Sequence, residues 1–208
     1  MSITFMIIIA TGIVTYMGFN DHSLFDKFKF SVSGIQSGEY YRLITSAFLH
    51  ADWTHFIFNM ITLYFFGDFT QSAFGTQGLL MIYFGGIILG NYLSYYFHKN
   101  NLWYAAIGAS GGVNAVVFAA ITVEPFMTIN FIIPGFLYAL GYLWYTTKGT
   151  QSQSSNIGHE AHFGGAIIGV ALALILNYQL SFIAHPIITI LIIGALVGGY
   201  IYMEKKKI

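Results

Sequence analysis

The sequence predicts an all-α membrane protein, a polytopic bundle of transmembrane helices. Hydrophobic residues make up 56% of its 208 positions and charged residues only 8%, whereas a soluble domain carries about 25% charge. The apolar residues fall into runs of about 20, the length that crosses the hydrocarbon core of a bilayer. The 15 tyrosines and 3 tryptophans suit helix ends at the membrane–water interface. Lipid is therefore the expected surrounding of most of this chain.

Composition also argues against several classes of function. The formal net charge is zero, which gives no basis for binding nucleic acid. The absence of cysteine removes disulfides, thiolate metal sites and cysteine nucleophiles. No basic segment precedes the first apolar run and no cleavage-type site follows it, so we expect a first transmembrane span rather than a signal peptide.

We expect a core at residues 1–180 with six spans, followed by a C-terminal seventh span and a basic tail at 181–208. The connection at 20–52 is too long for a turn and carries several charges, which predicts a structured loop at the interface. Gln151–Asn156 is a polar linker. The expected spans are Ile3–Phe19, Trp53–Phe74, Gly78–Phe97, Tyr104–Val123, Phe126–Thr146, Gly158–Asn177 and Phe182–Met203.

Polar residues gather at one end of spans two, four and six, which run in the same direction. They are His55 and Asn59, Ser110, and His162 respectively. A helix from Ser110 to Val123 rises only about 21 Å, less than the roughly 30 Å core of a bilayer. We therefore expect Ser110 to lie below the membrane surface, with His162 at a similar depth.

Ser110 has two interpretations. It stands among Gly108, Gly111 and other small residues, which alone is typical of a face for close helix packing. A serine becomes a nucleophile only when a base removes its proton. The candidate base is His162, because an imidazole within a span is costly and usually functional, although hydrogen bonding to a carbonyl would also explain it.

The residues around His162 favour a pair of catalytic groups rather than a triad. Gly165 and Gly169 follow on its face of the helix, where they would let spans four and six approach closely. Glu160 is two positions away and faces elsewhere on a helix. The metal alternative is weak, because His159-Glu160-Ala161-His162 has one residue fewer than the zinc-protease pattern.

His55 and Asn59 share one helical face at spacing i, i+4. Two polar side chains on an otherwise apolar helix suit the stabilisation of a developing oxyanion. Hydrogen bonding between helices is the alternative. His50, in the preceding loop, is expected to bind the chain structurally.

Taken together, these residues resemble the rhomboid family of intramembrane serine proteases. The resemblance covers spans one to six. The motifs that carry it are Gly108-Ala109-Ser110-Gly111, the set His50, His55 and Asn59, the set Ala161, His162, Gly165 and Gly169, and the first-loop pair Tyr41-Arg42.

The resemblance implies a Ser110/His162 dyad without metal or cofactor. Ser110 would attack a peptide carbonyl with His162 as general base, and an acyl-enzyme would then be hydrolysed. His55, Asn59 and the Ser110 backbone N–H would hold the oxyanion. The implied partners are the lipid bilayer and a substrate's transmembrane helix, and span five with loop Thr147–Ile157 would be the mobile gate.

Three features depart from the family pattern. Asn114 stands where several members carry an aromatic ring that packs on the catalytic histidine, and Gln71 stands where many have Glu. The third concerns orientation. The resemblance implies a bacterial plasma-membrane protein with an extracytoplasmic active site, whereas all Lys and Arg lie on the active-site side of the seven-span map, which the positive-inside rule makes cytoplasmic.

Two other functions fit parts of the sequence. A catalytically inactive relative would bind membrane helices as an adaptor, but such proteins lose the serine or the histidine, and this chain has both. A transporter would use the intramembrane His and Asn side chains as an ion path, and it predicts no serine-specific reactivity.

Overall fold

The computed structural model describes residues 2–129, 132–150 and 158–206. The predicted linker Gln151–Asn156, most of loop Thr147–Ile157 and Lys207 lie outside these ranges. The elements are helices α1 (Ile3–Asn20), α2 (His22–Phe28), α3 (Val32–Gln36), α4 (Arg42–Thr45), α5 (Trp53–His98), α6 (Ser110–Val123), α7 (Gly135–Gly149), α8 (His159–Leu176) and α9 (Pro186–Lys205), the short helices η1 (Ser46–Phe48) and η2 (Gln179–Ile183), and strands β1 (Phe30–Ser31), β2 (Ala105–Ala106), β3 (Thr128–Ile129) and β4 (Ile133–Pro134).

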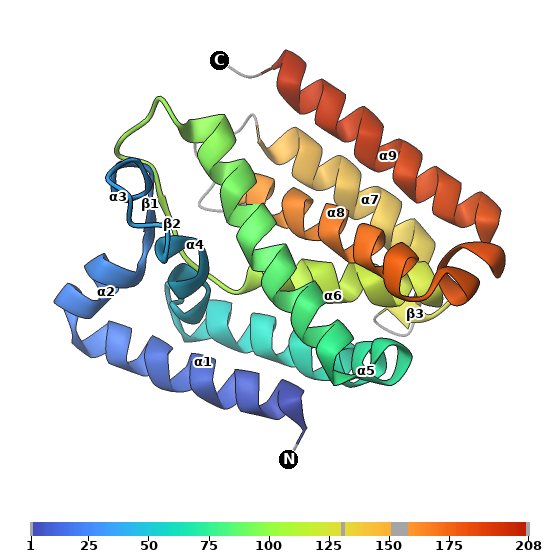
Figure 1. The fold of residues 1–208 in the computed structure, drawn as a ribbon, viewed down its shortest axis with the longest axis horizontal. Coiled ribbons are helices and arrows are strands. Elements are labelled where there is room, and N and C mark those ends of the chain that lie inside the picture. Colours follow the sequence, from blue (N-terminus) through green and yellow to red (C-terminus); the bar gives the residue numbers. More distant parts are fainter. Residues whose placement is uncertain (1, 130–131, 151–157, 207–208) are drawn as a thin grey trace.

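Helix α6 forms the centre of the bundle (Figure 1). All residues from Gly111 to Val123 are buried, as expected for a helix that is apolar on every side. Helices α5 and α8 pack against α6 and against each other, α1 packs on α5, and α9 packs mainly on α7. The residues before and after α6 therefore lie within reach of several neighbouring helices.

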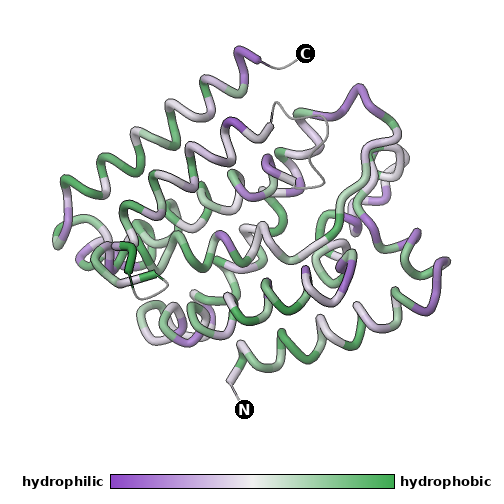
Figure 2. The backbone as a smooth tube through the Cα atoms, turned by 180° about the vertical axis from the view of Figure 1, so that it is seen from behind, coloured by the Kyte–Doolittle hydropathy of each residue, from purple (hydrophilic) through white to green (hydrophobic). Residues whose placement is uncertain are grey.

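The prediction of a helical membrane protein is confirmed. Among the described residues, four helices are long and apolar enough to cross a bilayer, namely α1, α5, α8 and α9, and Figure 2 shows hydrophobic residues along the helices. Spans two and three are the two halves of α5, which breaks at Gly75 with φ 72°. A hydrogen bond from Gln71 Nε2 to Thr76 Oγ1 (3.1 Å) joins the two sides of this break.

Two predicted spans have the wrong boundaries. Residues 104–109 precede the helix rather than belong to it, because β2 pairs with β1. Residues 126–129 and 132–134 are not helical either, since β3 pairs there with β4 in antiparallel orientation. Pro125 disfavours helical backbone at Glu124, which has φ −129° and ψ 76°. Helix α7 consequently begins only at Gly135.

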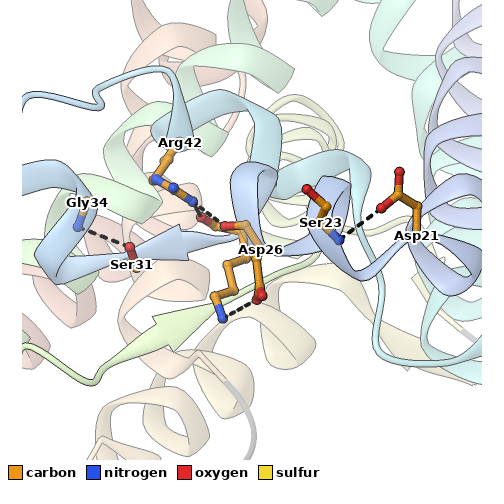
Figure 3. Close-up of polar contacts among 7 residues, drawn as sticks. Asp21, Ser23, Asp26, Ser31, Gly34 and Arg42 are labelled. Atoms are coloured by element: carbon orange, nitrogen blue, oxygen red, sulfur yellow. Dashed lines mark hydrogen bonds and ion pairs between the residues drawn. The ribbon is translucent and has the colours of Figure 1, made fainter.

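The first loop is structured, as predicted, and the buried side chain of Arg42 connects its parts. The Arg42 guanidinium donates through Nη1 to the carbonyls of Asp26 (2.7 Å) and Lys29 (2.8 Å). It also forms an ion pair with Glu39 at 2.6 Å. Figure 3 shows Arg42 reaching across to the α2 segment. Its contacts assign this residue to the architecture of the loop.

Helix α9 ends beside α7. Lys148 Nζ donates to the Tyr202 hydroxyl at 2.9 Å, and the ammonium lies 4.4 Å from the centre of the Tyr202 ring. The C-terminal ends of both helices lie at the end of the bundle where α6 and α8 begin, because Gly149 of α7 and Met203 of α9 line the same pocket as Ser110 and His162.

Glycines set the spacing of the three central helices. A Cβ atom on Gly165 or Gly169 of α8 would overlap the carbonyls of Gly111 and Ala115 in α6, respectively. On the other side, a Cβ atom on Gly90 of α5 would lie 2.6 Å from the carbonyl of Ala161. These backbones are in direct contact, so no larger residue fits without moving a helix.

We predict that Gly169→Ala lowers the free energy of unfolding by about 1–3 kcal/mol, because the added methyl group overpacks the α6–α8 contact. Gly198→Ala in α9 is the matched control, since nothing lies within 4 Å of a Cβ atom there. Thermal unfolding in detergent micelles measures both effects. Equal stabilities of the two variants would contradict the proposed close packing.

Candidate active site

Ser110 and His162 meet where α6 and α8 begin. Ser110 is the first residue of α6, and His162 lies one turn into α8. The distance between Ser110 Oγ and His162 Nε2 is 2.7 Å, a short hydrogen bond. Both residues are half-buried and line the same pocket. This arrangement can transfer a proton from the serine hydroxyl to the imidazole.

The backbone before Ser110 is held from the first loop. Gly108 has φ 122°, and its N–H donates to the Ser46 carbonyl at 3.0 Å. The Ala109 N–H donates to Nε2 of His50 at 3.4 Å. A Cβ atom on Gly108 would lie 2.7 Å from Cε1 of His55. Position 108 therefore requires glycine for both its backbone conformation and the space that His55 occupies.

His50 is buried in its neutral form. Its Nδ1 lies 3.0 Å from the Thr15 hydroxyl, which itself donates to the Phe48 carbonyl at 2.9 Å. Because Nε2 accepts from Ala109, the ring proton is on Nδ1. Burial, with a smaller contribution from His55, lowers the pKa of His50 to about 3. His50 connects α1 with the segment that carries Ser110.

His55 and Asn59 lie in the first turns of α5. The Asp52 side chain caps this helix by accepting from the His55 N–H at 2.7 Å. The Asn59 amide donates to the His55 carbonyl at 2.9 Å. Both side chains line the pocket with Ser110, although within the described ranges neither is hydrogen-bonded to it.

The start of α6 leaves backbone N–H groups available. No side chain caps it, and the first N–H groups of an α-helix have no partner within the helix. These groups also form the positive end of the helix dipole. The Ser110 N–H is thus available for an anion beside its own hydroxyl. Gly111, with no side chain, leaves room for the α8 backbone.

Tyr142, on α7, is the site residue that the sequence did not indicate. Its hydroxyl lies 2.9 Å from Nδ1 of His162, and the two rings stack at an interplanar angle of 25°. Asn114 does not contact His162 by any described hydrogen bond; its Nδ2 donates to the Ser110 carbonyl at 2.9 Å. The tyrosine spacing on α7 carried no signal that distinguished Tyr142 from a packing residue.

Glu160 points away from His162. Its carboxylate Oε1 lies 3.2 Å from His98 Nε2, and the His98 ring stacks on Tyr104 with centroids 3.8 Å apart. These contacts join the end of α5 to the start of α8. Among the described residues, no three His, Cys, Asp or Glu side chains gather as a metal site would require.

We predict a pH-dependent stability from His50. Its pKa is about 3 in the folded protein and about 6.5 ordinarily, so protonation favours the unfolded chain. The neutral His50 ring therefore makes its full contribution to the free energy of unfolding above about pH 6.5. Below this pH the contribution falls by up to about 1.4 kcal/mol per pH unit.

The comparison uses His50→Gln, which cannot titrate. The stability difference between the wild type and this variant should shrink as the pH falls from about 8 to about 5, measured by unfolding in detergent micelles. A difference that stays constant over this range would contradict a neutral, buried His50.

Comparison with known proteins assigns the family. A family model described as the Rhomboid domain matches residues 37–179. RHOMBOID-like protein 12, mitochondrial, of Arabidopsis thaliana is 33% identical over 174 residues, which cover 74% of this chain and 52% of that protein. Putative rhomboid protease YdcA of Bacillus subtilis is 36% identical over 80 residues, with 38% and 39% covered. Rhomboid protease AarA of Providencia stuartii is 30% identical over 190 residues, with 80% and 67% covered.

The alignment with the Arabidopsis protein spans only about half of that protein's length. The family model nevertheless covers more than half of this chain, including the Ser110 and His162 positions. The chain is an integral membrane protein that belongs to the rhomboid family.

Proposed function

We propose that this protein is an intramembrane serine endopeptidase that cleaves transmembrane segments of other membrane proteins. The observation that carries this proposal is the 2.7 Å contact between Ser110 Oγ and His162 Nε2, inside a bundle of apolar helices. A serine hydroxyl bonded to a neutral imidazole nitrogen is the arrangement that nucleophilic catalysis requires.

In the proposed reaction, Ser110 Oγ attacks the scissile carbonyl while His162 Nε2 accepts the hydroxyl proton. The tetrahedral intermediate collapses when His162 returns this proton to the leaving amine, and an acyl-enzyme remains. Water then attacks the ester, with His162 again as general base, and releases the carboxylic acid and free Ser110. The proposed reaction uses neither a metal nor a cofactor.

Three groups are proposed to hold the oxyanion: the Ser110 N–H and the side chains of His55 and Asn59. The pocket that they line supports this assignment, as does the uncapped start of α6. A donor in such a position contributes about 3 kcal/mol to transition-state stabilisation. The Asn59 amide has a second N–H besides the one that it donates to the His55 carbonyl.

The proposed substrate is a transmembrane helix that unwinds locally, because an intact helix shields its carbonyls. The cavity at Ser110, about 1410 Å³, exceeds the 300–1,000 Å³ of typical small-molecule sites and suits an extended peptide. It lies between Phe58 and Thr62 of α5 and Tyr142 of α7, so α7 is the proposed gate for entry from the lipid.

We further propose a six-span core at residues 1–180 with an additional span at 181–208, in a bacterial plasma membrane. Bacterial relatives support this location, and a plant relative is named as mitochondrial. The resemblance implies an extracytoplasmic site. The basic residues at the pocket end of the bundle favour the cytoplasmic side by the positive-inside rule.

The first prediction from this proposal concerns serine-specific reactivity. A fluorophosphonate probe should label the detergent-solubilised protein, the label should disappear in Ser110→Ala, and it should fall strongly in His162→Ala. Gel fluorescence measures the labelling. A well-folded wild-type protein that remains unlabelled would overturn the assignment as a peptidase, and a transporter predicts that result.

The second concerns the oxyanion. Asn59→Ala should reduce kcat about 10²–10³-fold, because it removes one donor to the transition state, with little effect on thermal stability. Ser72→Ala is the matched control, since this exposed side chain also donates one turn back along α5, to the Asp68 carbonyl at 2.9 Å. Cleavage of a fluorogenic transmembrane peptide in liposomes measures kcat, and equal rates would remove Asn59 from this role.

A further inference from the structure

We infer that Tyr142 is the positioning residue that orients His162 for proton transfer, taking the place that an acidic residue has in a catalytic triad. The inference rests on the proposed function, since it assigns how the general base is held. Two observations support it: the Tyr142 hydroxyl lies 2.9 Å from His162 Nδ1, and the two rings stack on each other.

The tautomer of His162 decides whether Ser110 can react. Nε2 accepts the serine proton only when the ring proton is on Nδ1, which then needs an acceptor. The atom 2.9 Å from Nδ1 is the oxygen of Tyr142. The hydroxyl oxygen can accept this N–H, and the same hydroxyl can donate its own proton elsewhere. Glu160 is unavailable for this role because it pairs with His98.

Asn114 lines the same pocket as Tyr142 and Ser110, and its Nδ2 donates to the Ser110 carbonyl at 2.9 Å. The hydroxyl at Nδ1 of His162 is that of Tyr142. When Tyr142 presents a lone pair to the Nδ1–H, it selects the tautomer that Ser110 needs.

The position of Tyr142 also links the chemistry to α7. Ser110, Asn114 and His162 come from α6 and α8, whose backbones are in contact. Tyr142 alone comes from α7, the proposed gate. A displacement of α7 away from α8 would break the hydrogen bond to Nδ1, so His162 is held for proton transfer only when α7 lies against it.

The test compares Tyr142→Phe with Tyr138→Phe. Both variants lose one hydroxyl on the same face of α7, and Tyr138 stacks on Tyr142 at 5.5 Å. Within the described ranges the Tyr138 hydroxyl has no hydrogen-bond partner, so it is the matched control. Tyr142→Phe retains the ring and its stacking, so thermal unfolding should remain close to that of the control.

We expect Tyr142→Phe to reduce kcat about tenfold with unchanged KM, and to slow fluorophosphonate labelling equally, while Tyr138→Phe resembles the wild type. A second readout is the ¹⁵N spectrum of labelled histidine, with His162 assigned by its loss in His162→Ala. It should show the Nδ1–H tautomer in the wild type and a mixture in Tyr142→Phe.

The outcomes separate this inference from the proposed function. Normal labelling of Ser110 combined with equal kcat values in the two tyrosine variants would overturn the role of Tyr142 alone. If the His162 tautomer is unchanged in Tyr142→Phe, the role of Tyr142 is also overturned. Absence of labelling in the folded wild type would overturn the peptidase assignment, and with it the inference.

Discussion

The close approach of α6 and α8 is the constraint on which the candidate site depends. Gly165 and Gly169 of α8 rest directly on the Gly111 and Ala115 carbonyls of α6. Any side chain between these backbones would move the helices apart. A hydrogen bond between serine and imidazole needs its two heavy atoms within about 3.2 Å, so the 2.7 Å contact at the start of the two helices requires their close packing further along.

The backbone just before α6 must also be hydrogen-bonded, because this helix begins inside the protein. Irregular backbone at membrane depth must find hydrogen-bond partners within the protein, because lipid offers none. The first loop supplies them: β1 pairs with β2, the Ser46 carbonyl accepts from Gly108, and His50 accepts from Ala109. The loop that Arg42 stabilises therefore also supports the backbone that presents Ser110.

The sequence predicted the helical class and the structured first loop, since each depends on local composition, and counting the spans placed Ser110 and His162 at one end of the bundle, where the structure brings them to 2.7 Å. It failed at residues 126–129 and 132–134, where hydropathy cannot distinguish two short apolar strands from a helix. It also failed for Tyr142. One tyrosine among 15 has no distinguishing spacing, and its contact with His162 arises only from the packing of α7 on α8.

Asn114 and Tyr142 together account for the departure from the family pattern. Several members of the family carry an aromatic ring at the position of Asn114, whereas the Asn114 side chain donates to the Ser110 carbonyl at 2.9 Å. The ring that stacks on His162 comes instead from α7. The aromatic contact is thus present although its position in the sequence differs, and the residue at 114 alone does not determine how His162 is held.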